Sequence, residues 1–205
     1  MKIISLFDYS GNWSKPWRKE FEVIQIDIKL GIDILIWNYK NIEKNNVYGI
    51  LAAIPCTDYA LSGAKHFKIK DRDGRTEKSN LLVKKTMEII NYFNPKFWVV
   101  ENPMSRIHKL NPELGRVKFK FHPYEFAGWN NNKEEQYQKT TWLFGNFTSP
   151  EKKPLPNVLG QKLYRNYGGK SERTKELRSI TPMGFSKAFF EANKIQLNKT
   201  KILDN

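Results

Sequence analysis

The sequence of 205 residues has little of what a disulfide-stabilised, zinc-clustered or membrane-spanning protein requires. Its only cysteine is Cys56, which excludes an intramolecular disulfide and any cysteine-rich zinc site. The longest apolar runs, 49–55 and 97–100, are far shorter than the roughly 20 apolar residues that cross a membrane. The apolar run before Asp8 is also too short to predict a signal peptide. We therefore expect a soluble, cytoplasmic protein without a membrane partner.

Acidic residues are also scarce. The chain has 21 Asp and Glu against 35 Lys and Arg, which gives a formal net charge of +14. Such an excess favours a polyanionic partner, most simply a nucleic acid. A solvated surface in a lysine-rich proteome is the alternative explanation of the same charge. The oligomeric state does not follow from either reading.

The apolar residues, 40% of the chain, are arranged as in an α/β domain. Near-continuous apolar runs predict strands that are covered on both faces. A helix is predicted over 77–95, where apolar residues recur at helical spacing until Asn94 and Pro95 stop it. The predicted strands cover 2–7, 22–28, 29–37, 48–55 and 97–100. This alternation of strands and helix implies a mainly parallel sheet.

The second half of the sequence changes character. The segments 116–129 and 139–147 alternate in the way that antiparallel strands do. The stretch 181–193 predicts a helix, with Thr181 as its N-cap and Pro182 as its first residue.

Polar residues follow three of the predicted strands. The segments 8–12, 55–59 and 101–106 come after the first, fourth and fifth strands, where parallel sheets bind their ligands. Within them, Cys56 and Glu101 can be neighbours. A thiolate adds readily to an electron-poor ring carbon, and a carboxyl group can hydrogen-bond a ring nitrogen and an exocyclic amine. Together they would activate a pyrimidine, although each alone is also explained as a buried small hydrophobe or a surface cap.

Several motifs resemble those of the DNA cytosine-5 methyltransferases. The stretch 55–63, PCTDYALSG, resembles the family's Pro-Cys motif, and 101–103, ENP, resembles its Glu-Asn motif. The stretch 5–12, SLFDYSGN, resembles the Phe-x-Gly-x-Gly cofactor turn. These motifs follow the family's order across residues 3–147, and the short chain is similar to compact phage members.

The resemblance implies a Rossmann-like S-adenosylmethionine-dependent methyltransferase fold, with a mainly parallel sheet and a reduced target-recognition region. It implies a catalytic domain over 1–147 and a reduced, basic recognition segment over 148–180. The remainder, 181–205, is expected to contain a C-terminal helix that packs back on the catalytic domain.

The resemblance also assigns residues to roles. The catalytic residues correspond to Cys56, Glu101 and Asn102. The residues expected to contact S-adenosylmethionine are Phe7, Ser10, Gly11, Asp27, Asp33, Ile34 and Pro55. Those expected to bind the nucleic acid, most simply DNA, are Ser62, Arg106, Lys139, Lys170, Arg173 and Lys175.

The chain departs from the family pattern in the later strand motif. This motif usually reads Gln-x-Arg-x-Arg, and its arginines bind the base and hold the glutamate. Here Lys139, Thr140 and Thr141 occupy the stretch, so we expect either a low activity or a guanidinium supplied by Arg106. The basic segment 57–75 is expected to be a long loop, either one that closes over the base or an ordinary surface loop.

The implied function is methylation of cytosine C5 in DNA, through a covalent bond between Cys56 and C6 of a base flipped out of the duplex. RNA, a free nucleotide or a modified donor are alternatives for the substrates. A third reading is a methyltransferase-like protein without catalysis, which binds nucleic acid or inhibits a host protein. The presence of Cys56 and Glu101 favours an enzyme, whereas the missing arginines favour the third reading. Either would work in the cytoplasm of a bacterial or phage-infected cell.

Overall fold

Six strands form a single sheet in the order β2-β1-β3-β4-β6-β5 in the computed structural model, which describes residues 1–161 and 172–195. The strands are β1 (Lys2–Leu6), β2 (Glu22–Ile26), β3 (Val47–Ala53), β4 (Phe97–Pro103), β5 (Phe119–Phe121) and β6 (Thr141–Asn146). The first four are parallel to one another, whereas β6 runs antiparallel to both β4 and β5. The predicted α/β class with a mainly parallel sheet is confirmed, as is the antiparallel pairing in the second half.

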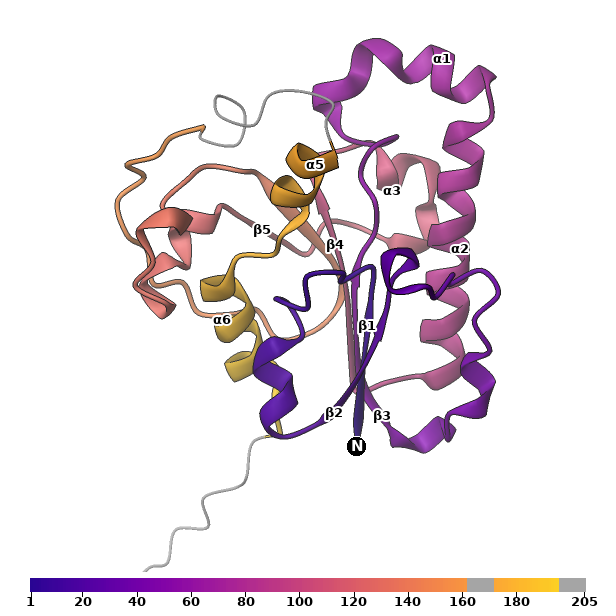
Figure 1. Cartoon of the computed structure of the whole chain (residues 1–205), viewed down its shortest axis with the longest axis horizontal. Helices are drawn as coiled ribbons and strands as arrows, with labels where there is room; N and C mark the ends of the chain where they lie inside the picture. The colour runs from indigo at the N-terminus through magenta and orange to yellow at the C-terminus, as the bar shows by residue number, and fades with distance from the viewer. Residues whose placement is uncertain (162–171, 196–205) are drawn as a thin grey trace, which may run out of the picture.

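Helices cover both faces of the sheet, which explains the near-continuous apolar sequence of its inner strands. Successive residues of a strand point to opposite faces, so Ile4 joins one core cluster and Ile3 the other. The helices α1 (Phe67–Arg72), α2 (Arg75–Phe93) and α3 (Ile107–Leu110) lie on the side of Ile4, and α6 (Met183–Asn193) lies on the side of Ile3 (Figure 1). The helix α5 (Glu172–Ser179) lies near the end of the sheet at which the parallel strands finish (Figure 1). Within the described ranges, every helix is too short or too polar to cross a membrane.

The helix α2 ends where the sequence predicts. Asn94 adopts a left-handed conformation with φ 45° and ψ 57°, and its N–H donates to the carbonyl of Ile90. Asparagine tolerates this conformation better than most residues, and the following Pro95 cannot continue a helix. The chain therefore leaves α2 sharply and enters β4.

The start of α6 differs from the prediction by one residue. Pro182 is the N-cap, and Thr181 lies outside the helix without capping it. The free N–H groups of the first turn are satisfied by Glu135, which is distant in sequence. Its two carboxylate oxygens accept from the N–H groups of Met183 and Gly184, at 2.8 and 2.9 Å. Because this cap comes from a residue distant in sequence, it has no fixed short spacing from the helix by which the sequence could predict it.

We expect Glu135→Ala to lower the free energy of unfolding by about 1–3 kcal/mol, because it leaves two helix N–H groups without their buried acceptor. Glu135 is only 7% exposed, so water replaces the carboxylate poorly. Urea unfolding of the purified protein measures the change. The matched control is Glu113→Ala at an exposed position, which should stay within about 0.5 kcal/mol of the wild type. Equal stability of the two variants would contradict the capping role.

The segment 29–37, predicted as a strand, instead forms turns. The carboxylates of Asp27 and Asp33 accept from the N–H groups of Lys29 and Leu35, both at 2.9 Å. Such side-chain bonds to the backbone two residues ahead compete with strand pairing and bend the chain. Cys56 therefore follows the third strand and not the fourth.

The segment 57–75 is also different from the expected loop. A 3₁₀-helix over Leu61–His66 continues into α1, and together these residues, 61–72, form what we call the helical arm. The arm projects beyond the end of the sheet on the side of α2 (Figure 1).

Candidate active site

The carboxyl ends of β1 and β3 flank the position where the connections of the sheet change direction. From β1 the chain passes to β2 on one side, and it later places β3 on the other side of β1. Open parallel sheets bind ligands at such a switch point, because the loops there diverge and leave a crevice. The loop after β1 and the Pro55–Cys56 turn after β3 are thus placed where a ligand is expected.

The loop after β1 turns sharply at its first residue. Phe7 has a φ of 59° and donates its N–H to the carbonyl of Ile26 at 2.8 Å. A positive φ is uncommon for a residue with a Cβ, and such residues cluster at ligand-binding sites. Gly11 has a φ of 67°, which glycine adopts without strain. Between these two turns, Tyr9 and Ser10 are exposed.

Asp8 supports this loop from beneath and was not predicted as a site residue. It is 4% exposed, and its Oδ2 accepts from the Ser5 hydroxyl at 2.9 Å and from the Ser14 N–H at 3.1 Å. Burial raises the pKa of Asp8, and the hydrogen bonds from Ser14 and Ser5 oppose that rise. The signal in the sequence was an acidic residue directly behind a buried apolar strand.

The predicted contacts after β2 have two different environments. Ile34 is 4% exposed and belongs to the core, so its side chain packs within the protein. Asp27 and Asp33 are half-buried, and each uses one carboxylate oxygen, Oδ1, to cap its own turn. Gly31, with φ 80°, reverses the chain between them. The two acids are therefore held by a pair of tight turns.

Cys56 and Glu101 lie at the ends of adjacent parallel strands. Glu101 pairs in register with Ala53, the last residue of β3. Asn102 is fully buried, and its Nδ2 donates to the carbonyl of Ile54 at 2.9 Å, so it ties the end of β3 to β4. Its Oδ1 has no hydrogen-bond partner within the described ranges. The strand ends are thereby fixed relative to each other.

Two cations complete this group. Lys139 precedes β6, and its Nζ lies 4.0 Å from Glu101 Oε1. The same Nζ donates to the backbone carbonyl of Arg178 at 3.2 Å, which brings the last turn of α5 to the site. The side chains of Glu101 and Lys139 are only 13% and 21% exposed. Arg178 was expected only within the basic recognition segment and not beside Cys56, because it lies in a charged stretch without a strand end or motif.

The protonation of Cys56 and Glu101 depends on burial and on these cations. Burial raises the pKa of the Cys56 thiol; Lys139 and Arg178 act against the rise, and Glu101 adds to it. Burial also raises the pKa of Glu101, and Lys139 acts against it. Both groups are therefore biased toward their neutral forms, and the cations limit that bias.

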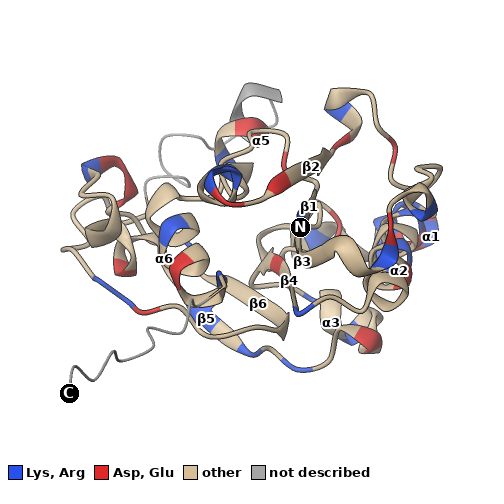
Figure 2. Cartoon of the chain, turned by 90° about the horizontal axis from the view of Figure 1, so that it is seen from below, with Lys and Arg blue, Asp and Glu red and all other residues tan. Residues whose placement is uncertain are grey.

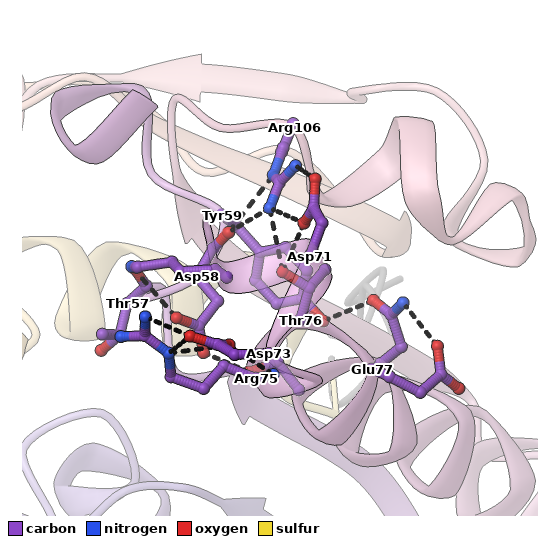
Figure 3. A network of polar contacts seen from close by, with 12 residues as sticks. Thr57, Asp58, Tyr59, Asp71, Asp73, Arg75, Thr76, Glu77 and Arg106 are labelled. Atoms are coloured by element: carbon purple, nitrogen blue, oxygen red, sulfur yellow. Dashed lines mark hydrogen bonds and ion pairs between the residues drawn. The ribbon is translucent and has the colours of Figure 1, made fainter. Parts of the chain in front are cut away.

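Arg106 is engaged elsewhere in the chain. Its guanidinium donates to both carboxylate oxygens of Asp71, at 2.8 and 2.6 Å, and to the Thr76 hydroxyl at 3.0 Å (Figure 3). It also stacks on the ring of Phe67, 3.7 Å from the centroid. Arg106 thus fastens the helical arm to the end of β4. Arg178, and not Arg106, is the arginine whose charge acts on Cys56.

A buried ion pair fastens the arm to the residues that follow Cys56. Lys70 Nζ lies 3.0 Å from Asp58 Oδ1, and the two side chains are 9% and 13% exposed. Lys70 also donates to the carbonyl of Thr57, and the Ser79 hydroxyl donates to Asp58 at 2.7 Å. The turn that carries Cys56 is therefore held from the arm and from α2.

The remaining predicted residues lie at the surface or beyond the description. Pro55 is exposed, and Ser62 is exposed in the helical arm. Lys170 lies outside the described residues; Arg173 and Lys175 lie in α5, where their side chains are not described. Basic residues also gather along α1 and the neighbouring part of α2 (Figure 2). The exposed cations of the helical arm are Lys65, Lys68 and Arg72.

No protein-family model matches the sequence, and no curated protein does. Among solved structures, the chain is similar to a prophage-encoded E. coli protein that is classed provisionally as a DNA modification methyltransferase. The TM-score is 0.45 and the identity 14%, over 84% of this chain and 56% of that one. The chain thus spans little more than half the length of that protein. A similarity at this level does not bear on function, which has to be inferred from the residues of the site.

Proposed function

We propose that the chain is an S-adenosylmethionine-dependent methyltransferase that modifies C5 of cytosine in DNA through a bond between Cys56 and C6. One observation carries this proposal: Cys56 and Glu101 lie at the carboxyl ends of adjacent parallel strands, with Lys139 beside the carboxyl group. A nucleophile and a carboxyl group in this arrangement can reach two edges of one pyrimidine ring. In this proposal residues 1–147 form the catalytic part, 148–180 contribute to recognition, and 181–205 contain the C-terminal helix.

Glu101 has the properties that are needed to bind and polarise the base. Because burial raises its pKa, the carboxyl group retains its proton more readily than an exposed glutamate. A protonated carboxyl group can donate to the ring nitrogen N3 while its other oxygen accepts from the exocyclic amine. The bond to N3 withdraws electrons from the ring and makes C6 a better electrophile. Asn102 acts as a positioning residue, because it fixes the end of β3 through Ile54.

The covalent step belongs to Cys56. Its thiolate adds to C6, and the new S–C bond moves a ring electron pair to C5. S-adenosylmethionine, when bound, supplies the methyl group that C5 takes up. C5 then loses its proton to water, the S–C6 bond breaks, and the ring double bond and the Cys56 thiolate are restored.

The residues after β1 and β2 fit the expected cofactor. The loop between Phe7 and Gly11 leaves Ser10 exposed at the switch point, where α/β folds bind adenosine-containing cofactors. Asp27 is half-buried directly after β2 and would bond the ribose hydroxyls. Asp33 would take the adenine amine. Ile34 would contribute through the core that supports Asp33, and Pro55 would border the site next to Cys56.

DNA is the substrate that the charge favours. A cytosine cannot be attacked inside a duplex and has to be flipped into the site. The net charge of +14 and the exposed cations of the helical arm, Lys65, Lys68 and Arg72, provide sequence-independent contacts to phosphates. Because the arm is fastened beside the turn that carries Cys56, such contacts would place the backbone of the bound DNA strand next to the thiol.

The direct test is methyl transfer from S-adenosylmethionine labelled in its methyl group to duplex DNA, RNA and cytidine nucleotides. We expect label in 5-methyldeoxycytidine after digestion of the DNA. Glu101→Gln should reduce the rate by about 10²-fold or more, because an amide cannot transfer or share the proton at N3 in the same way. The exposed control Glu113→Gln should leave the rate unchanged. Binding of nucleic acid without label in any of the three pools would reject the enzyme.

We expect Asp27→Asn and Asp33→Asn each to weaken S-adenosylmethionine binding by about tenfold, within the roughly 1–3 kcal/mol of a lost buried polar contact. Asparagine keeps the oxygen that caps each turn, so the loss reports the charge and not the local fold. Isothermal titration calorimetry measures the affinity, with Asp73→Asn in the segment after α1 as the control. Wild-type affinity in both variants would exclude these acids as cofactor ligands.

A further inference from the structure

The last turn of α5 is attached to the candidate active site on two sides. On one side, Lys139 Nζ donates to the carbonyl of Arg178 at 3.2 Å. On the other side, Glu176 forms an ion pair with Lys29 at 2.6 Å, close behind Asp27. These two contacts bridge the cysteine half and the proposed cofactor half of the site. A cavity of about 270 Å³ separates this turn from the loop after β1, and Tyr9, Ser10 and Leu177 are among the residues that line it.

We propose that Arg178 is a positioning residue that acts through Cys56: with Lys139, it supplies the positive charge that stabilises the thiolate. The inference rests on the proposed function, and it places on α5 a second cation that acts beside Lys139. It also means that the active site is completed from beyond residue 147. The segment expected to serve recognition would thus take part in activating the nucleophile.

The need for a second cation follows from the surroundings of the thiol. The charged groups that act on Cys56 are Glu101 on β4, Lys139 before β6 and Arg178 on α5. Lys139 also faces Glu101 at 4.0 Å, so its charge is shared between the carboxyl group and the thiol. Arg178 is not shared in this way, because its guanidinium makes no hydrogen bond or ion pair within the described ranges. Guanidinium remains protonated at every relevant pH, so its charge is always present.

Arg178 is also exposed, in contrast to the partly buried Glu101 and Lys139. An exposed cation can meet an anionic substrate group as well as the thiolate. Salt should weaken the effect of Arg178 on the thiol more than that of Lys139, since screening acts mainly on exposed charges. This difference separates the two cations experimentally.

Cys56 is the only cysteine, so its ionisation can be measured without substrate or cofactor. The rate of alkylation of the full chain by iodoacetamide, followed from acid to alkaline pH, reports the thiolate fraction. We expect Arg178→Gln to move the midpoint to higher pH and to slow alkylation at neutral pH by about three- to tenfold, since one pKa unit changes the thiolate fraction about tenfold. The alkylation midpoint of Arg178→Lys should stay near that of the wild type. Arg178→Glu should move the midpoint to higher pH than Arg178→Gln does.

The other variants fix the sign of the effect. Lys139→Gln should also move the midpoint upward, whereas Glu101→Gln should move it downward. The matched control is Arg116→Gln, which removes the same exposed charge at a position outside the group of charges that act on Cys56. Identical alkylation profiles for wild type, Arg178→Gln and Arg178→Glu would overturn the inference. So would an equal shift in the Arg116→Gln control.

The outcome is independent of methyl transfer. An ordered shift across the Arg178 variants without any labelled product would support the role of Arg178 at the thiol while the proposed function fails. If labelled product forms but the alkylation midpoint is the same in all Arg178 variants, the proposed function is supported and this inference is rejected. Circular dichroism of each variant ensures that the thiol is measured in the folded chain, because unfolding would move its midpoint toward that of a free cysteine.

Discussion

Replacing Cys56 with alanine is expected to abolish the covalent capture of DNA that contains 5-fluorocytosine. Fluorine at C5 cannot leave as a proton, so the S–C6 bond that wild type forms cannot be broken after methyl transfer. With S-adenosylmethionine present, the wild type should therefore migrate with the DNA in a denaturing gel. Cys56→Ala should give no adduct, and its methyl transfer should fall by on the order of 10³-fold or more, as removal of a nucleophile does elsewhere.

The controls separate a missing nucleophile from a damaged fold. Cys56→Ala should bind S-adenosylmethionine as the wild type does, because no proposed cofactor contact uses the sulfur. Its free energy of unfolding should change only modestly, since Cys56 is half-buried and has a small side chain. The wild type could instead bind fluorinated DNA tightly and form no adduct with fluorinated DNA, RNA or nucleotide. In that case Cys56 is a structural residue and the chain is a binding protein.

The sequence predicts the parts of the site that follow apolar strands. The runs before Pro55 and Glu101 are buried on both faces, so apolar residues follow one another there without alternating polar ones. This pattern predicts β3 and β4, and it places the residues that follow them at one edge of the sheet. The antiparallel segments are also predicted, although β5 is only three residues long. These predictions depend on local composition, which is why they are confirmed.

The sequence does not predict features that depend on tertiary contacts. The apolar segment 29–37 reads as a strand, but the carboxylates of Asp27 and Asp33 turn the chain. The polar segment 57–75 reads as a loop, but Arg106 stacks on Phe67 and holds it as a helical arm. Arg178 reaches the site from a helix without any motif.

We expect the second large effect from Lys70→Met, which breaks the buried ion pair between Lys70 of the helical arm and Asp58. This variant removes one partner of a buried pair and leaves the Asp58 carboxylate without its cation. Breaking such a pair from one side typically lowers the free energy of unfolding by about 3–5 kcal/mol. Methionine keeps most of the apolar stem of lysine, so the loss reflects the charge and its hydrogen bond to Thr57 rather than a cavity.

A double-mutant cycle measured by urea unfolding isolates the pair. Asp58→Asn should also destabilise, and combining it with Lys70→Met should recover part of the loss, because neither buried charge then remains unpaired. The control is the exposed pair of Lys84 and Glu77 on α2, whose side chains are 60% and 64% exposed. Lys84→Met should change the free energy of unfolding by at most about 1 kcal/mol. If Lys70→Met changes it no more than Lys84→Met does, the arm is not clamped by this ion pair, and the Cys56 turn has to be held by Arg106 and Asn102 alone.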